Sequence, residues 1–186
     1  MAWIIVAVVV VIALAALGWM WMRMQRSKRL QGRFGPEYER TLERSGDAGA
    51  AEAELREREQ RHDQFDIRPL RPEAQREYAA RWRDVQARFV DKPAAATNDA
   101  DALIGEAMGE RGYPVEDFEQ RAADLSVDHP DVVENYRAAH RVALANSRQQ
   151  ASTEDLRQAM VHYRALFERL IGAAEPEGDR TMEVRR

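Results

Sequence analysis

The sequence predicts an all-α protein with an N-terminal transmembrane helix, a charged linker helix and a small helical bundle. The chain opens with 22 uncharged residues. After position 72 its apolar residues recur at intervals of three and four, the spacing of one helix face, and no stretch alternates as a half-buried strand does. The predicted segments are an anchor at 1–22, a basic juxtamembrane segment at 23–36, charged linker helices at 37–65, the helical bundle at 66–172 and a disordered tail at 173–186.

Residues 1–22 are expected to anchor the chain in a membrane. As a helix this run reaches roughly 30 Å, which is about the thickness of the hydrocarbon core. Trp3 lies near one end, and Trp19 and Trp21 lie near the other, where indole rings meet lipid headgroups. A cleaved signal fits less well, because no basic residue precedes the run and the run is longer than the apolar part of a typical signal. A core helix would be apolar all round and would need a larger soluble domain to enclose it.

The charges beside this run predict its orientation. No basic residue precedes the run, and five follow it: Arg23, Arg26, Lys28, Arg29 and Arg33. The positive-inside rule places this flank in the cytoplasm, with the N-terminus outside and the helical domain at the cytoplasmic face of the plasma membrane. The alternative is an exported domain tethered to the membrane. The five cations could also contact anionic lipid headgroups, at about 1 kcal/mol each, or serve only as a topology signal.

The rest of the chain is acidic. The chain has 28 basic and 32 acidic residues, and its first 35 residues contain five basic and no acidic ones, so residues 36–186 have a net charge of −9. A body of this sign is repelled by phosphate backbones, so nucleic acid is not an expected partner. The absence of cysteine excludes disulfides and thiolate chemistry. The expected partners are the membrane and an unidentified protein.

Residues 48–64 are predicted to form a charged spacer helix. Leu55 is the only large apolar side chain before Phe65 at the end of the segment. Acid–base pairs four residues apart support such a helix by a few tenths of a kcal/mol each. The expected pairs are Glu52–Arg56, Glu54–Arg58 and Glu57–Arg61. With little apolar surface to bury, this helix is expected to fray, and either to act as a stalk or to lie lightly on the helical domain.

The bundle follows from five helical patterns with identifiable ends. Pro72 suits a first helical turn, and Gly112 suits a C-cap. Ser152 and Asp155 have the spacing of a capping box. Trp82 lies on an apolar stripe and is expected in the core, whereas an exposed Trp82 would indicate a partner surface. The helices are expected over about 72–91, 93–112, 115–125, 128–143 and 153–171, the fourth starting at Asp128-His129-Pro130.

Several strings resemble a known but uncharacterised family. These are RFGPEYER at 33–40, FDIRPLRP at 65–72, GYPVEDFEQRAADLSVDHP at 112–130 and STEDLRQAMVHYRALF at 152–167. In this order they resemble actinobacterial single-span membrane or "secreted" proteins, over about residues 33–171. The resemblance implies an anchored helical domain. It implies no activity and no functional residues.

No catalytic constellation is found in the sequence. Glu59 and His62 form a single Glu-x-x-His motif, whereas a di-metal bundle needs two such motifs and two further Glu residues. No Gly-x-Ser-x-Gly elbow and no phosphate loop with its lysine occurs. We therefore predict no catalytic residue, no metal and no cofactor, and a protein that is not an enzyme.

Two non-enzymatic functions remain. The leading hypothesis is a membrane-anchored interaction or scaffold protein. The alternative is a small-ligand sensor or accessory domain, with a pocket between helices near Tyr136, His140 and Tyr163. Tyr136 and His140 share a helix face, and their ordinary interpretation is a hydrogen-bonded, partly buried pair. Unpaired polar groups in a pocket would favour the sensor, and a contiguous apolar surface would favour the interaction protein.

Overall fold

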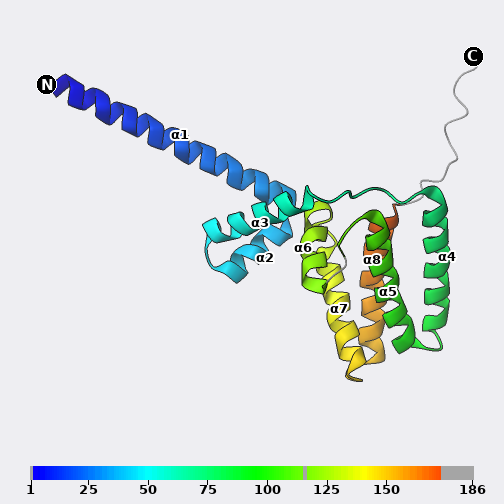
Figure 1. Cartoon of the computed structure of the whole chain (residues 1–186). Helices are drawn as coiled ribbons and strands as arrows, with labels where there is room; N and C mark the ends of the chain where they lie inside the picture. Colours follow the sequence, from blue (N-terminus) through cyan, green and yellow to red (C-terminus); the bar gives the residue numbers. More distant parts are fainter. Residues whose placement is uncertain (1, 115–116, 173–186) are drawn as a thin grey trace, which may run out of the picture. The chain divides into compact units, whose positions relative to one another are not determined.

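The computed structural model describes residues 2–114 and 117–172, except for the side chains of residues 2, 4–13 and 23. Within these ranges it is built from helices alone, which confirms the predicted all-α class (Figure 1). The helices are α1 (Ala2–Phe34), α2 (Pro36–Ser45), α3 (Ala48–His62), α4 (Pro72–Phe89), α5 (Pro93–Arg111), α6 (Phe118–Asp128), α7 (Val133–Ser147) and α8 (Thr153–Ile171).

The predicted anchor falls largely on side chains outside the described part of the chain. In the part that is described, no helix combines the length and the apolar character that crossing a membrane requires. The transmembrane assignment of residues 1–22 therefore stays a prediction. The predicted disordered tail, 173–186, also lies outside the described residues.

The chain divides into two compact units, Met1–Glu59 and Gln60–Arg186. The division falls in the last turn of α3, whereas the sequence placed it between residues 65 and 66. Most of the helix predicted as a linker is thus part of the N-terminal unit.

In the N-terminal unit, α2 connects two helices that run in the same direction. Gly46 ends α2 in the left-handed conformation, with φ of 68°, and its N–H donates to the Leu42 carbonyl. The left-handed conformation favours glycine, because glycine has no Cβ. Arg33 of α1 forms an ion pair with Glu59 of α3 at 3.0 Å. The Tyr38 hydroxyl donates to Glu52 at 3.4 Å and lies 3.3 Å from the Ser27 hydroxyl. Because residue 27 is thereby linked to residue 52 and residue 33 to residue 59, α1 and α3 are parallel.

The expectation that α3 has too little to bury and stands as a stalk is wrong. Leu55 is fully buried. Arg58 is also buried and donates to Glu37 of α2 at 2.8 Å and to Glu54 at 2.6 Å. Polar contacts to a buried guanidinium replace the missing apolar face, so the helix packs within its unit instead of standing free.

Of the three predicted charge pairs in α3, the structure forms Glu54–Arg58. Arg56 instead donates from Nε to the backbone carbonyl of Glu52 at 3.0 Å. Arg61 pairs with Asp124 of α6 at 3.1 Å. Other acceptors thus compete successfully with acid–base pairs along the helix, which contribute only a few tenths of a kcal/mol each.

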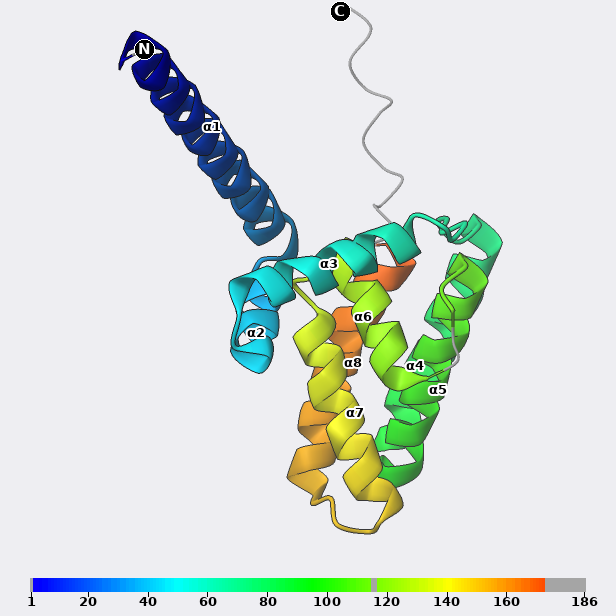
Figure 2. The ribbon, with the colours of Figure 1, turned by 60° about the vertical axis from the view of Figure 1, so that its left-hand side comes forward.

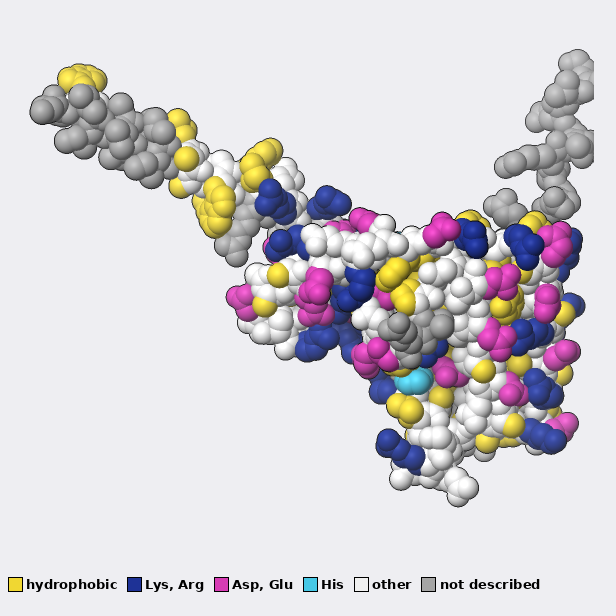
Figure 3. Space-filling model, in the orientation of Figure 1, with side chains coloured by type: hydrophobic (Ala, Val, Ile, Leu, Met, Phe, Trp, Pro, Cys, Tyr) yellow, Lys and Arg dark blue, Asp and Glu magenta, His cyan; other side chains and the backbone are white. Residues whose placement is uncertain are grey.

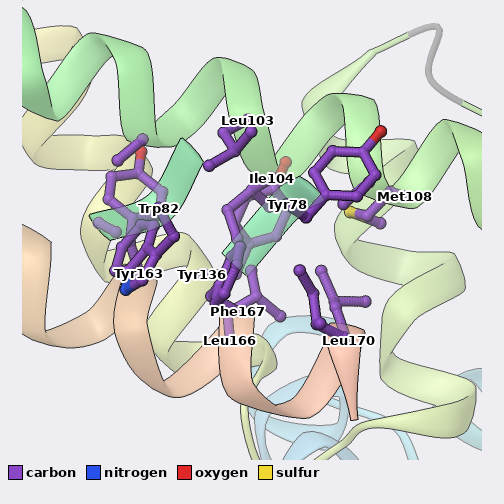
Figure 4. Close-up of a cluster of buried hydrophobic side chains, with 14 of the residues drawn as sticks. Tyr78, Trp82, Leu103, Ile104, Met108, Tyr136, Tyr163, Leu166, Phe167 and Leu170 are labelled. Carbon is purple, nitrogen blue, oxygen red and sulfur yellow. The ribbon is translucent and has the colours of Figure 1, made fainter. Parts of the chain in front are cut away.

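In the C-terminal unit, α5 packs against α4, α7 and α8, and α7 packs along α8 (Figures 1 and 2). The core lies between these helices, and Figure 4 shows its aromatic and aliphatic side chains. Trp82 is buried and stacks on Phe167, with ring centroids 4.7 Å apart. The predicted core position of Trp82 is confirmed.

The helix ends agree with the sequence in most places. Pro72 opens α4, and Ser152 and Asp155 form the predicted capping box of α8. Gly112 caps α5 with φ of 100°, and a Cβ there would collide with the Asp66 carbonyl. The predicted helix start at 128–130 is wrong. The His129 N–H bonds to the Leu125 carbonyl and closes α6, and α7 begins only at Val133.

Candidate functional site

Residues that the sequence singled out as a possible pocket meet around Asp101. Tyr163 of α8 donates its hydroxyl hydrogen bond to Asp101 Oδ1 of α5 at 2.8 Å. His140 of α7 places Nδ1 3.6 Å from the same oxygen, within ion-pair distance but beyond a hydrogen bond. Tyr136, one turn before His140, is fully buried. Helices α7 and α8 therefore bring the three predicted residues to one acidic centre on α5, which the sequence did not identify as part of a site.

The electrostatics of this centre keep Asp101 charged. Burial by itself would raise the pKa of the carboxyl, but His140 and the donated hydrogen bond of Tyr163 outweigh burial and hold the pKa below its usual value. Burial and the Asp101 charge raise the pKa of Tyr163 well above its ordinary value. At neutral pH the pair is thus an ionised acceptor and a protonated donor.

Tyr136 and His140 do not form the expected hydrogen-bonded pair. Within the described part of the chain, the buried Tyr136 hydroxyl and His140 Nδ1 have no hydrogen-bond partner. The imidazole stacks instead on the ring of Phe118, with centroids 3.6 Å apart and planes 6° apart. Phe118 also contacts Tyr136, with centroids 4.8 Å apart. An aromatic neighbour, which offers no strong acceptor, takes the place of the predicted partner.

Arg121 of α6 is a further member that sequence reasoning missed. Its Nη1 would lie 2.9 Å from a Cβ at position 105, so Gly105 leaves room for the guanidinium against α5. Its positive charge helps to lower the pKa of Asp101, and its Nε is buried without a hydrogen-bond partner among the described residues. Gly105 was the available signal, because glycine inside a helix costs stability and usually has a packing reason.

This cluster, which we call the Asp101 cluster, comprises Asp101, Arg121, Tyr136, His140 and Tyr163. It offers one negative charge, one permanent positive charge and a hydroxyl with free hydrogen-bonding capacity. Such a set can orient a small polar ligand.

A second polar cluster lies at the end of α6. Asp128 Oδ2 accepts the Tyr113 hydroxyl at 2.6 Å and lies 2.8 Å from His62 Nε2. Burial would raise the pKa of Asp128, but the hydrogen bonds from Tyr113 and His62 outweigh burial and lower the pKa. These contacts tie residues far apart in the sequence, so we interpret the cluster as structural.

Metal binding finds no support among the described residues, where no group of three or more His, Cys, Asp or Glu side chains could hold an ion. The members of the single Glu-x-x-His motif have separate partners. Glu59 pairs with Arg33, and His62 pairs with Asp128.

The five predicted lipid-contacting cations have different surroundings. Arg33 is engaged with Glu59. Arg26, Lys28 and Arg29 are exposed. The side chain of Arg23 lies outside the described residues.

Comparison with known proteins does not identify the chain, since no protein family, curated protein or solved structure matches it. The resemblance to actinobacterial single-span proteins therefore stays a prediction. The function must be argued from the residues themselves.

The two buried tyrosines of the Asp101 cluster provide a matched test. In residues 60–186, Tyr163→Phe is expected to reduce the free energy of unfolding by about 1.5–3 kcal/mol, because the charged acceptor Asp101 loses the hydrogen bond that the Tyr163 hydroxyl donates. Tyr136→Phe is expected to leave it within about 0.5 kcal/mol or to raise it slightly, because the lost hydroxyl has no partner. Urea unfolding followed by circular dichroism measures both, and equal losses would contradict the assigned geometry.

Proposed function

We propose that this chain is a non-enzymatic interaction or scaffold protein, anchored in a membrane by α1. The observation that carries the proposal is the exposure of α1. All nine residues from 14 to 22 are uncharged and exposed. The large apolar side chains among them are 49–65 % exposed: Leu14, Leu17, Trp19, Met20, Trp21 and Met22. Figure 3 shows hydrophobic side chains along this helix.

The distribution of these side chains favours lipid over a protein partner. Successive residues of a helix are rotated by about 100°, so residues 14–22 cover its whole circumference. A helix that docks on a protein surface is apolar along one stripe, whereas a helix that is apolar all round is found in a protein core or in a membrane. Elsewhere in the described chain the exposed large apolar side chains are scattered. They are Trp3 and Met24 of the same helix, Val90, Leu144 and Val161.

We place the C-terminal unit in the cytoplasm and the N-terminus outside. The support is the basic flank that follows residue 22, with no basic residue before it. The acidic remainder of the chain would present itself to a protein partner and not to nucleic acid. An exported domain tethered by the same helix is the alternative topology.

The anchor makes a direct prediction. Full-length protein is expected to stay in the membrane pellet during alkaline carbonate extraction, and a chain that starts at Arg23 is expected to be released. Val10→Asp with Leu14→Asp should also release the protein, because both positions lie near the middle of the 22-residue run, where each charge costs about 2.5–3.5 kcal/mol.

The matched control is Val10→Ala with Leu14→Ala, which should stay in the pellet. Release of the full-length protein would contradict the anchor.

With the anchor in place, a phosphatase fused after Arg186 should be inactive and a cytoplasmic fluorescent reporter should be active. The reverse pattern would favour the exported topology.

A small-ligand sensor is the second candidate, and one observation favours it. Among the residues that the structure describes, the buried hydroxyl of Tyr136 has no hydrogen-bond partner, and neither have Arg121 Nε and His140 Nδ1. Unsatisfied buried groups are costly, and a ligand that supplied an acceptor would remove the cost.

The sensor predicts a selective gain in thermal stability. In a thermal-shift screen of small carboxylates and amides on residues 60–186, a true ligand should raise Tm for the wild type and not for Tyr136→Phe or Arg121→Gln. Leu144→Ala, an exposed change on α7, is the control and should keep the full rise. A rise that survives in all variants, or no rise with any compound, would contradict the sensor.

A further inference from the structure

A cleft lies between α1 and α3 in the N-terminal unit. Its volume is about 250 Å³. Its lining residues are Trp19, Met22 and Arg26 from α1, and Gly49, Glu52 and Arg56 from α3. Typical small-molecule sites have volumes of about 300–1,000 Å³, so the cleft suits a compact group such as a headgroup and not a large ligand.

The spacing of these residues explains how the cleft forms. Positions 19, 22 and 26 are three and four residues apart, and so are 49, 52 and 56, so each set lies along one face of its helix. One face of α1 and one face of α3 line the cleft from opposite sides, and the two helices run parallel. The wall that α1 contributes changes from apolar to basic toward the C-terminal end of α1, because Trp19 and Met22 are followed by Arg26.

The two arginines of the cleft lack acidic partners among the described residues. Arg26 contacts the Met22 sulfur at 3.4 Å. Arg56 donates from Nε to the Glu52 backbone carbonyl. Elsewhere in the same unit, arginines are paired with carboxylates, as in Arg33–Glu59, Arg44–Glu54 and Arg58–Glu37.

Tyr38 explains why Arg56 is available. Glu52 lies four residues before Arg56 and is the expected pairing partner of this arginine. The Tyr38 hydroxyl donates to Glu52 Oε1 and competes for that carboxylate. Glu52 still contributes one negative charge to the cleft, so the cleft carries a net charge of about +1 from two arginines and one glutamate.

From this geometry we infer that the cleft binds the phosphate of an anionic lipid headgroup, held by Arg26 and Arg56. Guanidinium groups make charge-assisted, often bidentate contacts with phosphate. The apolar run that ends at Met22 would place the cleft at the surface of the bilayer, and an indole such as Trp19 favours that depth. The assignment of this phosphate to a lipid rests on the proposed membrane anchor. Free phosphate would bind the same two arginines without a membrane.

The full-length chain in phosphatidylcholine bilayers provides the test. Electron spin resonance of spin-labelled phosphatidylglycerol and phosphatidylcholine gives the ratio of their association with the protein. The measurement is made in about 1 M NaCl, where the Debye length is about 3 Å and diffuse attraction to exposed charges is largely screened.

The wild type is expected to prefer phosphatidylglycerol, and Arg26→Gln or Arg56→Gln should each lower this preference by about fivefold. Arg29→Gln is the matched control, since Arg29 is an exposed cation of α1 outside the cleft lining, and its diffuse attraction to headgroups is largely screened at about 1 M NaCl. It should leave the preference nearly unchanged. All three changes are at exposed positions, and circular dichroism should show equal helix content.

Equal losses in the three variants, or no preference in the wild type, would overturn the cleft and leave the anchor standing. Failure of the chain to insert into phosphatidylcholine bilayers would overturn the anchor and the lipid source together. Inorganic phosphate added to the bilayers is expected not to abolish the preference. If it does so through Arg26 and Arg56, the cleft is a free-phosphate site and the lipid assignment is wrong.

Discussion

The buried ion pair between Glu37 and Arg58 is the interaction on which the N-terminal unit depends. Both side chains are almost fully buried, and their 2.8 Å contact joins α2 to α3. Removal of one partner from such a pair typically costs about 3–5 kcal/mol, because the other charge stays buried and loses a charge-assisted hydrogen bond. Without this pair, α3 would have only Ala51 and Leu55 to bury, and a charged helix with so small an apolar face would not stay docked. The docked α3 in turn places Arg56 opposite α1 and so creates the basic cleft.

The two units have different polar arrangements, and the proposals follow from that difference. In the N-terminal unit, the exposed apolar residues 14–22 lead into a cleft whose two arginines have no acidic partner among the described residues, which is the basis of the proposed lipid contact. In the C-terminal unit, the partly buried Asp101 accepts the hydrogen bond of Tyr163, whereas the Tyr136 hydroxyl has no hydrogen-bond partner among the described residues. This difference is the basis of the ligand-binding alternative for the C-terminal unit.

The sequence was sufficient for the helices and for most of their ends, because apolar spacing, the Ser152–Asp155 capping box and the cap at Gly112 are local signals. It also placed Tyr136, His140 and Tyr163 on faces that converge. It could not identify Asp101 or Arg121 as their neighbours, since that proximity arises from the packing of α5 and α6 against distant helices. The docking of α3 was missed for a similar reason. A buried arginine looks in the sequence like any other member of a charged helix, and only the partner on α2 distinguishes it.

Amide hydrogen exchange of the full-length chain tests the role of the Glu37–Arg58 pair most directly. The account predicts that residues 51–58 are well protected in the wild type. In Glu37→Gln their protection should fall by about a hundredfold or more, as expected for a loss of about 3–5 kcal/mol. Residues 156–167 should be unaffected, and Glu57→Gln, an exposed change on the same helix, should have little effect. Fast exchange of residues 51–58 in the wild type, or unchanged protection in Glu37→Gln, would contradict the account.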